Sequence, residues 1–335
     1  RGGQSQLQPA SVELLRPSEE GWSSELIRDP AAVVIHKAIV HDGGILTISG
    51  ALPDSGKPGL LSHWKKSGDR WQVKRIWAGQ WPGKLNRLRD LEIGDVDGDG
   101  LDEVVIGTHD YGAVVILDGA LDGTERGGRE LAVEARRFVH EIELLDLDGD
   151  GVSEIVATRS EPNLSVRSQA GTIERFRYDG QSYIQDTLWS SEETHVKEVL
   201  AADMDGDGRS ELFAAVEAVR VEGTRTGPTQ LIQLELDADG SVSWRHLADL
   251  EDEGLRFMVA EELDGESPKE LILSPRETGL YVYRWESSGT GELQQFEMAS
   301  GGFEHAIQTL DLDSDGRSEL YVADAMTKRI VRYDW

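Results

Sequence analysis

Short apolar and β-branched runs alternate along the chain with clusters of Gly, Asp, Asn and Ser. Runs of this length with polar boundaries are typical of strands joined by turns. Between residues 83 and 138 the pattern predicts strands at 89–94, 104–108, 113–117 and 131–138. It predicts comparable third strands at residues 172–178, 230–236, 279–285 and 329–333. The chain is therefore predicted to be all-β, without a long helix.

This unit of strands recurs with a period near fifty residues. Its most distinct copies begin at Asp95, Asp146, Asp203 and Asp311. The long interval before Asp311 contains a weaker copy at residues 262–273 (ELDGESPKELIL), and a shortened copy lies at residues 36–48 (HKAIVHDGGILTI). A repeat of this length indicates a propeller or an array.

Four strands in each unit predict a single-domain β-propeller of six four-stranded blades. Seven blades would follow if two degenerate units had been merged. The last unit has only three strands, so we expect residues 11–29 to supply its outer strand and close the ring, which removes an open sheet edge. Residues 1–10 are expected to be flexible. The predicted blades are residues 30–82, 83–138, 139–193, 194–252, 253–303, and 304–335 together with 11–29.

Four loops share the pattern Asp-x-Asp-x-Asp-Gly-x-x-Glu, with carboxylates at positions 1, 3, 5 and 9. Ca²⁺ takes six to eight oxygen ligands, which such a tight loop can supply, whereas Mg²⁺ demands stricter octahedral geometry. An EF-hand would need its acid at position 12 and flanking helices. A cluster of Asp and Gly also occurs in ordinary surface turns, but four copies in one frame favour about four Ca²⁺ sites.

The predicted calcium ligands fall at equivalent positions in the four loops. The side chains are those of Asp95, Asp97, Asp99, Glu103, Asp146, Asp148, Asp150, Glu154, Asp203, Asp205, Asp207, Glu211, Asp311, Asp313, Asp315 and Glu319. The main-chain carbonyls at position 7 are those of Leu101, Val152, Arg209 and Arg317. Because the loop is repeated from blade to blade, we interpret the metal as a structural staple rather than a catalytic ion.

These units resemble FG-GAP/VCBS repeats, the calcium-loop repeats of integrin α-chain propellers and of many secreted bacterial proteins. The resemblance implies calcium between the first two strands of a blade, in a protein outside the cell or on its surface. Two units depart from the pattern: the loop of Glu262, Asp264, Glu266 and Glu270 has Ser267 where glycine belongs, and the first unit has only Asp42. We predict no tight calcium site in either.

A second repeated feature lies six residues before position 1 of each loop. The residue there is basic or histidine in every unit, which predicts either a framework role within each blade or a ring of ligands at the channel mouth. Such a ring would attract anions, and its histidines could share a metal. The residues are His36, Arg89, His140, Lys197, Arg256 and His305.

The composition narrows the range of partners. The chain has 335 residues, no cysteine and a formal net charge of −29, which argues against nucleic acid and anionic membranes as partners. No apolar run is long enough to span a bilayer, so membrane insertion is not expected, and no signal sequence is present in this chain. Disulfides and thiolate metal sites are excluded, and the compartment is left open by the lack of cysteine.

The sequence predicts a calcium-stabilised extracellular, periplasmic or cell-surface propeller that binds or scaffolds a protein or glycan. No nucleophile elbow, zinc-protease motif, phosphate loop or dinucleotide fingerprint occurs, so an enzyme is not expected. The alternatives are a carbohydrate-active enzyme similar to polysaccharide lyases, a lectin with a site at the channel mouth, and a purely structural subunit. Nine tryptophans could stack on sugar rings, although tryptophans between blades are more often packing residues.

Overall fold

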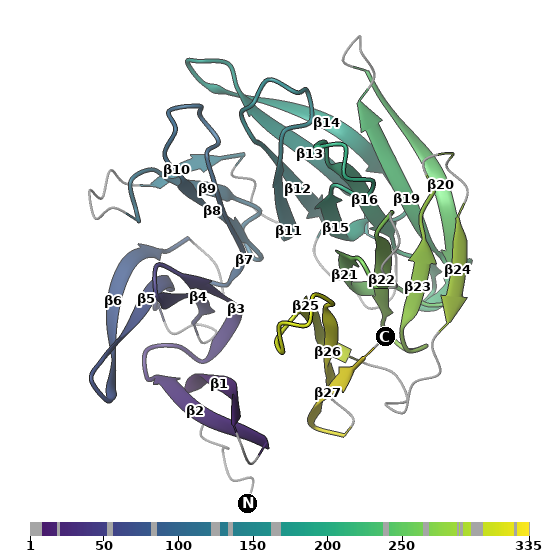
Figure 1. The fold of residues 1–335 in the computed structure, drawn as a ribbon. Coiled ribbons are helices and arrows are strands. Elements are labelled where there is room, and N and C mark those ends of the chain that lie inside the picture. The colour runs from purple at the N-terminus through teal and green to yellow at the C-terminus, as the bar shows by residue number, and fades with distance from the viewer. Residues whose placement is uncertain are drawn as a thin grey trace, which may run out of the picture. The chain divides into compact units, whose positions relative to one another are not determined.

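The computed structural model describes most of the chain as strands and turns, and it contains no helix in that part (Figure 1). The described residues are 9–18, 21–51, 56–81, 86–121, 128–132, 137–161, 169–236, 241–263, 268–286, 288, 291–295, 304–324 and 327–334. Within them, no helix is long and apolar enough to cross a membrane.

The chain divides into two compact units, each described here by itself. The first comprises residues 1–95 and 99–142, and the second comprises residues 96–98 and 143–335. The first unit contains a hairpin, two complete sheets and the start of a third. Its strands are β1 (Ala10–Ser18), β2 (Gly21–Asp29), β3 (Val34–His41), β4 (Gly44–Gly50), β5 (Gly59–Ser67), β6 (Arg70–Gly79), β7 (Leu88–Gly94), β8 (Glu103–Thr108), β9 (Val114–Leu117), β10 (Gly128–Leu131) and the beginning of β11 (Phe138–Leu145).

The second unit contains the remaining sheets and a small inserted hairpin, β17 with β18. Its further strands are β12 (Glu154–Ser160), β13 (Gly171–Tyr178), β14 (Tyr183–Ser191), β15 (Val196–Ala202), β16 (Glu211–Val216), β17 (Val219–Val221), β18 (Thr224–Thr226), β19 (Thr229–Leu236), β20 (Val242–Leu250), β21 (Leu255–Glu261), β22 (Glu270–Pro275), β23 (Tyr281–Arg284), β24 (Glu292–Gln295), β25 (Glu304–Leu310), β26 (Glu319–Asp324) and β27 (Arg329–Tyr333).

Six antiparallel sheets follow one another along the chain and are the six blades of a β-propeller, as the repeat predicts. In chain order we number them blade 1 (β3–β6), blade 2 (β7–β10), blade 3 (β11–β14), blade 4 (β15, β16, β19, β20), blade 5 (β21–β24) and blade 6 (β25–β27). Each blade is a meander in which consecutive strands pair. The first strands of successive blades lie against one another, as β3 does with β7, β15 with β21, and β21 with β25.

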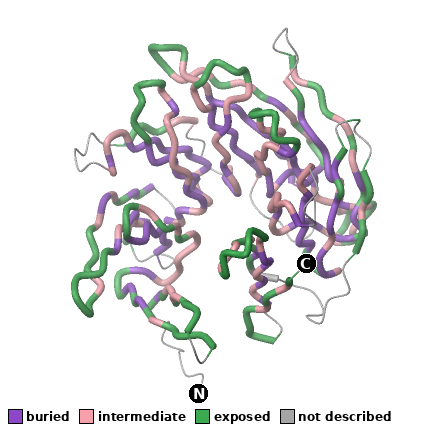
Figure 2. The backbone as a smooth tube through the Cα atoms, in the orientation of Figure 1, coloured by how far each residue is buried: buried purple, intermediate pink, exposed green. Residues whose placement is uncertain are grey.

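The second strand of each blade lies inside a sheet and contributes an apolar run to the core, such as Val104–Ile106 of β8. All residues of β4, β8, β12 and β22 are buried, whereas most residues of the fourth strands β6, β14 and β20 are exposed or half-buried. Figure 2 shows the same contrast between inner and outer strands. Trp64, Trp81 and Trp285 are buried, but Trp22 and Trp244 are about half exposed.

Two strand predictions are wrong. The N-terminal segment is not one closing strand: β1 and β2 pair with each other along their whole length, from Ala10 with Asp29 to Ser18 with Gly21. A hairpin forms because each strand satisfies the backbone groups of the other. Blade 6 has three strands among the described residues. Residues 131–138 are not one strand either, because β10 ends at Leu131 and Phe138 already begins blade 3.

Candidate metal loops and the neighbouring cleft

The four acidic loops each connect the first and second strands of a blade, and we name them loop 2 (residues 95–103), loop 3 (146–154), loop 4 (203–211) and loop 6 (311–319). In each, at least three carboxylates offer oxygen atoms that all lie within 4.8 Å of one another. The groups are Asp95, Asp97 and Asp99; Asp146, Asp148 and Glu154; Asp203, Asp205 and Asp207; and Asp311, Asp313, Asp315 and Glu319. The predicted ligands Glu103, Asp150 and Glu211 are outside these groups.

Backbone amides hold each loop in its folded form. The carboxylate at position 1 accepts hydrogen bonds from later amides of the loop: in loop 3, Asp146 accepts from Gly149 at 2.7 Å and from Gly151 at 2.8 Å. The amide of position 7 donates to the carboxylate of position 5, as Val152 does to Asp150 at 2.8 Å. These contacts turn the chain around a common centre, which brings the carboxylates together.

Positive φ angles at positions 4 and 6 make this turn. Position 6 has φ between 83° and 90° in all four loops, where glycine avoids a steric penalty. Position 4 has φ near 77° in the first three loops, where it is glycine, and 62° at Ser314 of loop 6. Position 4 was not predicted to need a positive φ, although glycine stands there in three of the four loops.

The glutamate at position 9 also has a framework role, which was not predicted from the sequence. One of its oxygens accepts the backbone amide of position 2: Leu147 donates to Glu154 at 2.6 Å and Met204 to Glu211 at 2.9 Å. The degenerate loop of blade 5 keeps this bond, with Leu263 donating to Glu270 at 3.0 Å. The glutamate therefore fastens the loop to the second strand, whether or not the loop has its full set of acids.

The crowded carboxylates affect one another's charge. Burial raises the pKa of Glu154 to about 7, and the negative charges of Asp148 and Asp146 add to this rise. Burial likewise raises the pKa of Glu211, with Asp205 contributing. A hard cation among these oxygens would offset the repulsion, so the donor set of loops 2, 3 and 4 fits Ca²⁺.

Loop 6 differs because an arginine from the third strand of its blade reaches its acids. Nη2 of Arg332 lies 2.8 Å from Asp313 and 3.1 Å from Glu319. In blade 3 the corresponding contact is longer, with Arg175 at 3.5 Å from Glu154. The guanidinium in loop 6 already supplies positive charge to two of the four predicted ligands. Asp264 and Glu266, in the degenerate loop of blade 5, lie outside the described residues.

The repeated basic position coincides with a β-bulge in the first strand of the blade. The pairing register between first and second strands skips His36, Arg89, Lys197 and Arg256, so each side chain is directed independently of the ladder. Lys197 pairs with Glu217 of its own blade at 2.8 Å. This contact supports the framework interpretation for Lys197.

In the first unit His36, Arg89 and His140 each contact another basic or histidine side chain. Nη1 of Arg89 lies 3.5 Å from Nδ1 of His36, and the ring of His140 packs edge-on against His109 with centroids 5.2 Å apart. Burial and the charge of Arg89 lower the pKa of His36 to about 4. Among the described residues, the groups that could hold a metal contain no histidine. The side chain of His305 lies outside the described residues, so the complete ring stays a prediction.

The acid that follows the basic position connects neighbouring blades, which sequence reasoning had not assigned. Asp90 of blade 2 accepts the amide of Ile142 in blade 3 at 2.8 Å and the ammonium of Lys37 in blade 1 at 2.8 Å. Glu198 of blade 4 accepts the amide of Met258 in blade 5 at 3.0 Å. The sequence contained a signal for this role, because an acid directly follows the basic residue in three of the units.

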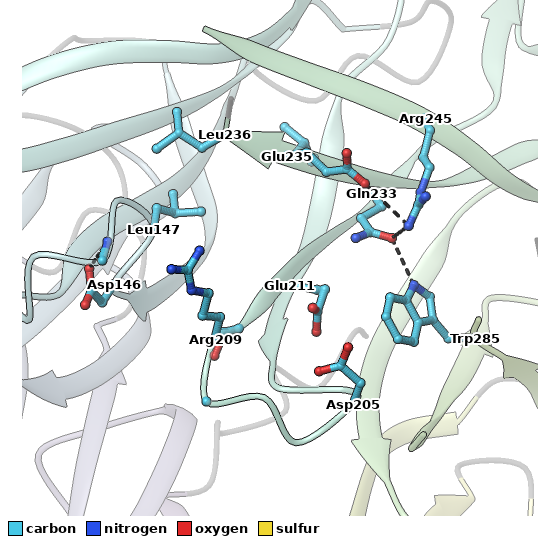
Figure 3. Close-up of a pocket in the computed structure, with 14 residues that line it drawn as sticks. Asp146, Leu147, Asp205, Arg209, Glu211, Gln233, Glu235, Leu236, Arg245 and Trp285 are labelled. Carbon is cyan, nitrogen blue, oxygen red and sulfur yellow. Dashed lines mark hydrogen bonds and ion pairs between the residues drawn. The ribbon is translucent and has the colours of Figure 1, made fainter. Parts of the chain in front are cut away.

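A cleft of about 580 Å³ lies within the second unit, between loops 3 and 4 and the outer half of blade 4 (Figure 3). Its walls combine carboxylates, two arginines and an amide with the edges of several leucines. It is lined by Asp146, Leu147, Gly149, Asp205, Gly208, Arg209, Ser210, Glu211, Gln233, Leu234, Glu235, Leu236, Arg245 and Trp285. Its volume is in the range of about 300 to 1,000 Å³ found for small-ligand sites.

Comparison with known proteins supports the fold and the repeat. Residues 95–157 match the family described as FG-GAP-like repeat. No curated protein gives a significant sequence match. A solved structure of PorZ, described as an essential bacterial surface component of the type-IX secretion system of Porphyromonas gingivalis, has a TM-score of 0.55 and 11% identity. The alignment covers 94% of this chain but 44% of PorZ, so the chain spans less than half the length of that protein.

Two further solved structures share the fold. A protein from Lactobacillus plantarum has a TM-score of 0.55 and 11% identity over 98% of this chain and 96% of its own. BBS1N, solved in complex with ARL6DN, has a TM-score of 0.51 and 12% identity over 90% and 78% of the two chains. At such low identity the likeness concerns the fold alone. The chain is therefore a six-bladed β-propeller, in which residues 95–157 are similar to an FG-GAP-like repeat.

Proposed function

We propose that this protein is a calcium-stabilised, non-catalytic binding module that works outside the cytoplasm, in the periplasm, at the cell surface or in the extracellular space. The observation that carries the proposal is the grouping of three or four carboxylates within 4.8 Å in each of four equivalent loops. An arrangement repeated from blade to blade serves stability better than chemistry, because catalysis needs one open coordination position at one place.

The proposed location follows from the affinity that such loops would have. Each loop is largely exposed, and extracellular calcium modules typically bind with Kd of about 10⁻⁴ to 10⁻³ M. Calcium at that level is available outside the cell. PorZ, which shares the fold, is described as a bacterial surface component, and this description is consistent with the proposal.

A binding role is favoured because the propeller presents different side chains at the same position of successive blades. Directly after the second strand stand His109, Glu217 and Arg276 in blades 2, 4 and 5. A rigid scaffold with variable residues at its loops is a common way to build a binding face. The partner we propose is a protein or a glycan.

The metal proposal is tested by thermal unfolding with calcium and with a chelator. A ligand that binds only the folded state stabilises it by about 2.7 kcal/mol per site when its concentration is 100 times Kd. We therefore expect a clear rise in the melting temperature with calcium, and a smaller rise with magnesium. Asp148→Asn and Asp205→Asn should each reduce the number of bound calcium ions by about one in calorimetric titration.

The control is Asp69→Asn, which changes an exposed acid in the turn between β5 and β6. It should leave the calcium stoichiometry unchanged. An identical melting temperature in calcium and in chelator would refute the stabilising role. Pull-down and glycan-array binding with the calcium-loaded protein then test the binding role, which fails if neither yields a partner.

A further inference from the structure

The cleft beside loop 4 differs from the equivalent places in blades 3 and 6 at one residue of the third strand. Blade 3 has Arg175 and blade 6 has Arg332 at the position that pairs two residues after the loop glutamate, and both contact that glutamate. In blade 4 the same register position is Gln233, opposite Phe213. No arginine of the third strand therefore occupies the space in front of Glu211.

The orientation of Gln233 is fixed by its neighbours. Its side-chain oxygen accepts hydrogen bonds from the indole of Trp285 at 2.9 Å and from the guanidinium of Arg245 at 2.7 Å. Both partners can only donate, so the oxygen must face them and the amide nitrogen must face away. Figure 3 shows this nitrogen turned toward the side of the cleft on which Arg209 and Glu211 lie.

Gln233 is therefore a buried donor that points into an open cleft. The residue is only 3% exposed, and its amide nitrogen has no partner among the described residues. The nitrogen is not sealed off from the cleft, so a water or a ligand group that can accept is able to reach it. A ligand acceptor placed against this nitrogen would satisfy it.

Further polar groups of both kinds surround the same space. Arg209 extends from loop 4 toward Leu147 of loop 3, and its guanidinium forms no ion pair within the described part of the chain (Figure 3). Glu235 offers carboxylate oxygens near Arg245, at 3.4 Å. The cleft thus combines donors that have no partner among the described residues with acceptors, and its leucine edges provide narrow apolar surface.

We propose that this cleft binds a neutral saccharide, with Gln233 and Arg209 donating to its ring or hydroxyl oxygens. A sugar hydroxyl can donate and accept at once, so a polyhydroxylated ligand satisfies both kinds of group in one small volume. A neutral ligand also avoids repulsion by a chain of net charge −29. The inference rests on the proposed binding function and names the ligand class and the site.

The test is ligand-observed NMR and calorimetry on the calcium-loaded, full-length protein. The probes are glucose, galactose, mannose and N-acetylglucosamine with their common disaccharides, and glucuronate serves as the charged comparison. We expect at least one neutral sugar to bind with Kd of about 1 mM or tighter. Arg209→Ala and Gln233→Glu should each weaken that binding at least tenfold.

Both variants are chosen so that the fold stays intact. Arg209→Ala keeps the backbone of loop position 7, and Gln233→Glu keeps an oxygen for Trp285 and Arg245 while it removes the donor. Arg317→Ala is the matched control, because Arg317 is the exposed residue at the same position of loop 6. Gln72→Glu, on the exposed face of β6, controls for the added charge.

The inference is overturned if no neutral sugar binds, if glucuronate binds more tightly than glucose, or if Arg317→Ala weakens binding as much as Arg209→Ala. These outcomes are separate from the failure of the proposed function. Calcium-dependent melting together with a partner found by pull-down would uphold the binding module while the cleft was shown not to be a sugar site.

Discussion

The tie from Asp90 to the neighbouring blades predicts a large loss of stability when its carboxylate is removed. Asp90 is 2% exposed, and its two oxygens accept the amide of Ile142 and the ammonium of Lys37, both at 2.8 Å. Asp90→Ala would leave the amide buried and unpaired, whereas Lys37 would keep its contact with Glu92. Hydrogen bonds to charged groups contribute about 1.5 to 3 kcal/mol each, and an unpaired buried group costs a further 1 to 3 kcal/mol.

Because Lys37 keeps one acid, we expect Asp90→Ala to lower the free energy of unfolding by about 3 kcal/mol rather than the full sum of both contacts. Asp90→Asn keeps one acceptor and should lose about half as much. The measurements are urea unfolding and hydrogen exchange, in which the Ile142 amide should lose protection. Asp69→Ala, an exposed acid, controls for the change in net charge. If the free energy of unfolding of Asp90→Ala were within about 0.5 kcal/mol of the wild-type value, the contacts of Asp90 with the neighbouring blades would not stabilise the fold.

Two more predictions concern acid and calcium. Burial lowers the pKa of His36 and of His195 to about 4, below the usual 6.5, so the unfolded chain binds more protons between these values. Stability should therefore fall as pH drops from about 6.5 to about 4, by up to about 3 kcal/mol for each histidine. In His195→Gln the free energy of unfolding should depend less steeply on pH across this range than in the wild type. An equal slope would contradict the lowered pKa of His195. Arg332→Met should lower the melting temperature without calcium and tighten calcium binding at loop 6, because the competing guanidinium is gone. Calorimetric titration that gave weaker or unchanged calcium affinity would count against competition.

Much of the fold could be predicted because the same pattern of strands and acidic loop recurs along the sequence. A loop such as residues 95–103 encodes its own turn through alternating acids and glycines, so four copies located the joint between the first two strands in four blades. The apolar runs then placed the central strands, such as β8, which are buried on both faces. Local patterns sufficed here because each blade repeats the same environment.

Other features depend on pairing between distant residues, which a single sequence does not display. Strand register places Gln233 opposite Phe213, at the position that arginine occupies in blades 3 and 6. Register also brings Arg332 to the acids of loop 6. The bulges at the basic positions arise from a mismatch between two strands. The N-terminal hairpin was missed because Leu14 and Leu26 read equally well as parts of one outer strand or of two paired strands.

The hydrogen bond from the position 2 amide to the loop glutamate fixes the shape of a loop independently of its other acids. Blade 5 keeps the bond between Leu263 and Glu270 although its loop has lost part of the acidic pattern. The acids of a loop can therefore be substituted while the hydrogen bond that fastens the loop to the second strand is kept. On the proposal that these loops hold calcium, selection could set the number of bound ions one at a time and match it to the calcium concentration of a particular habitat.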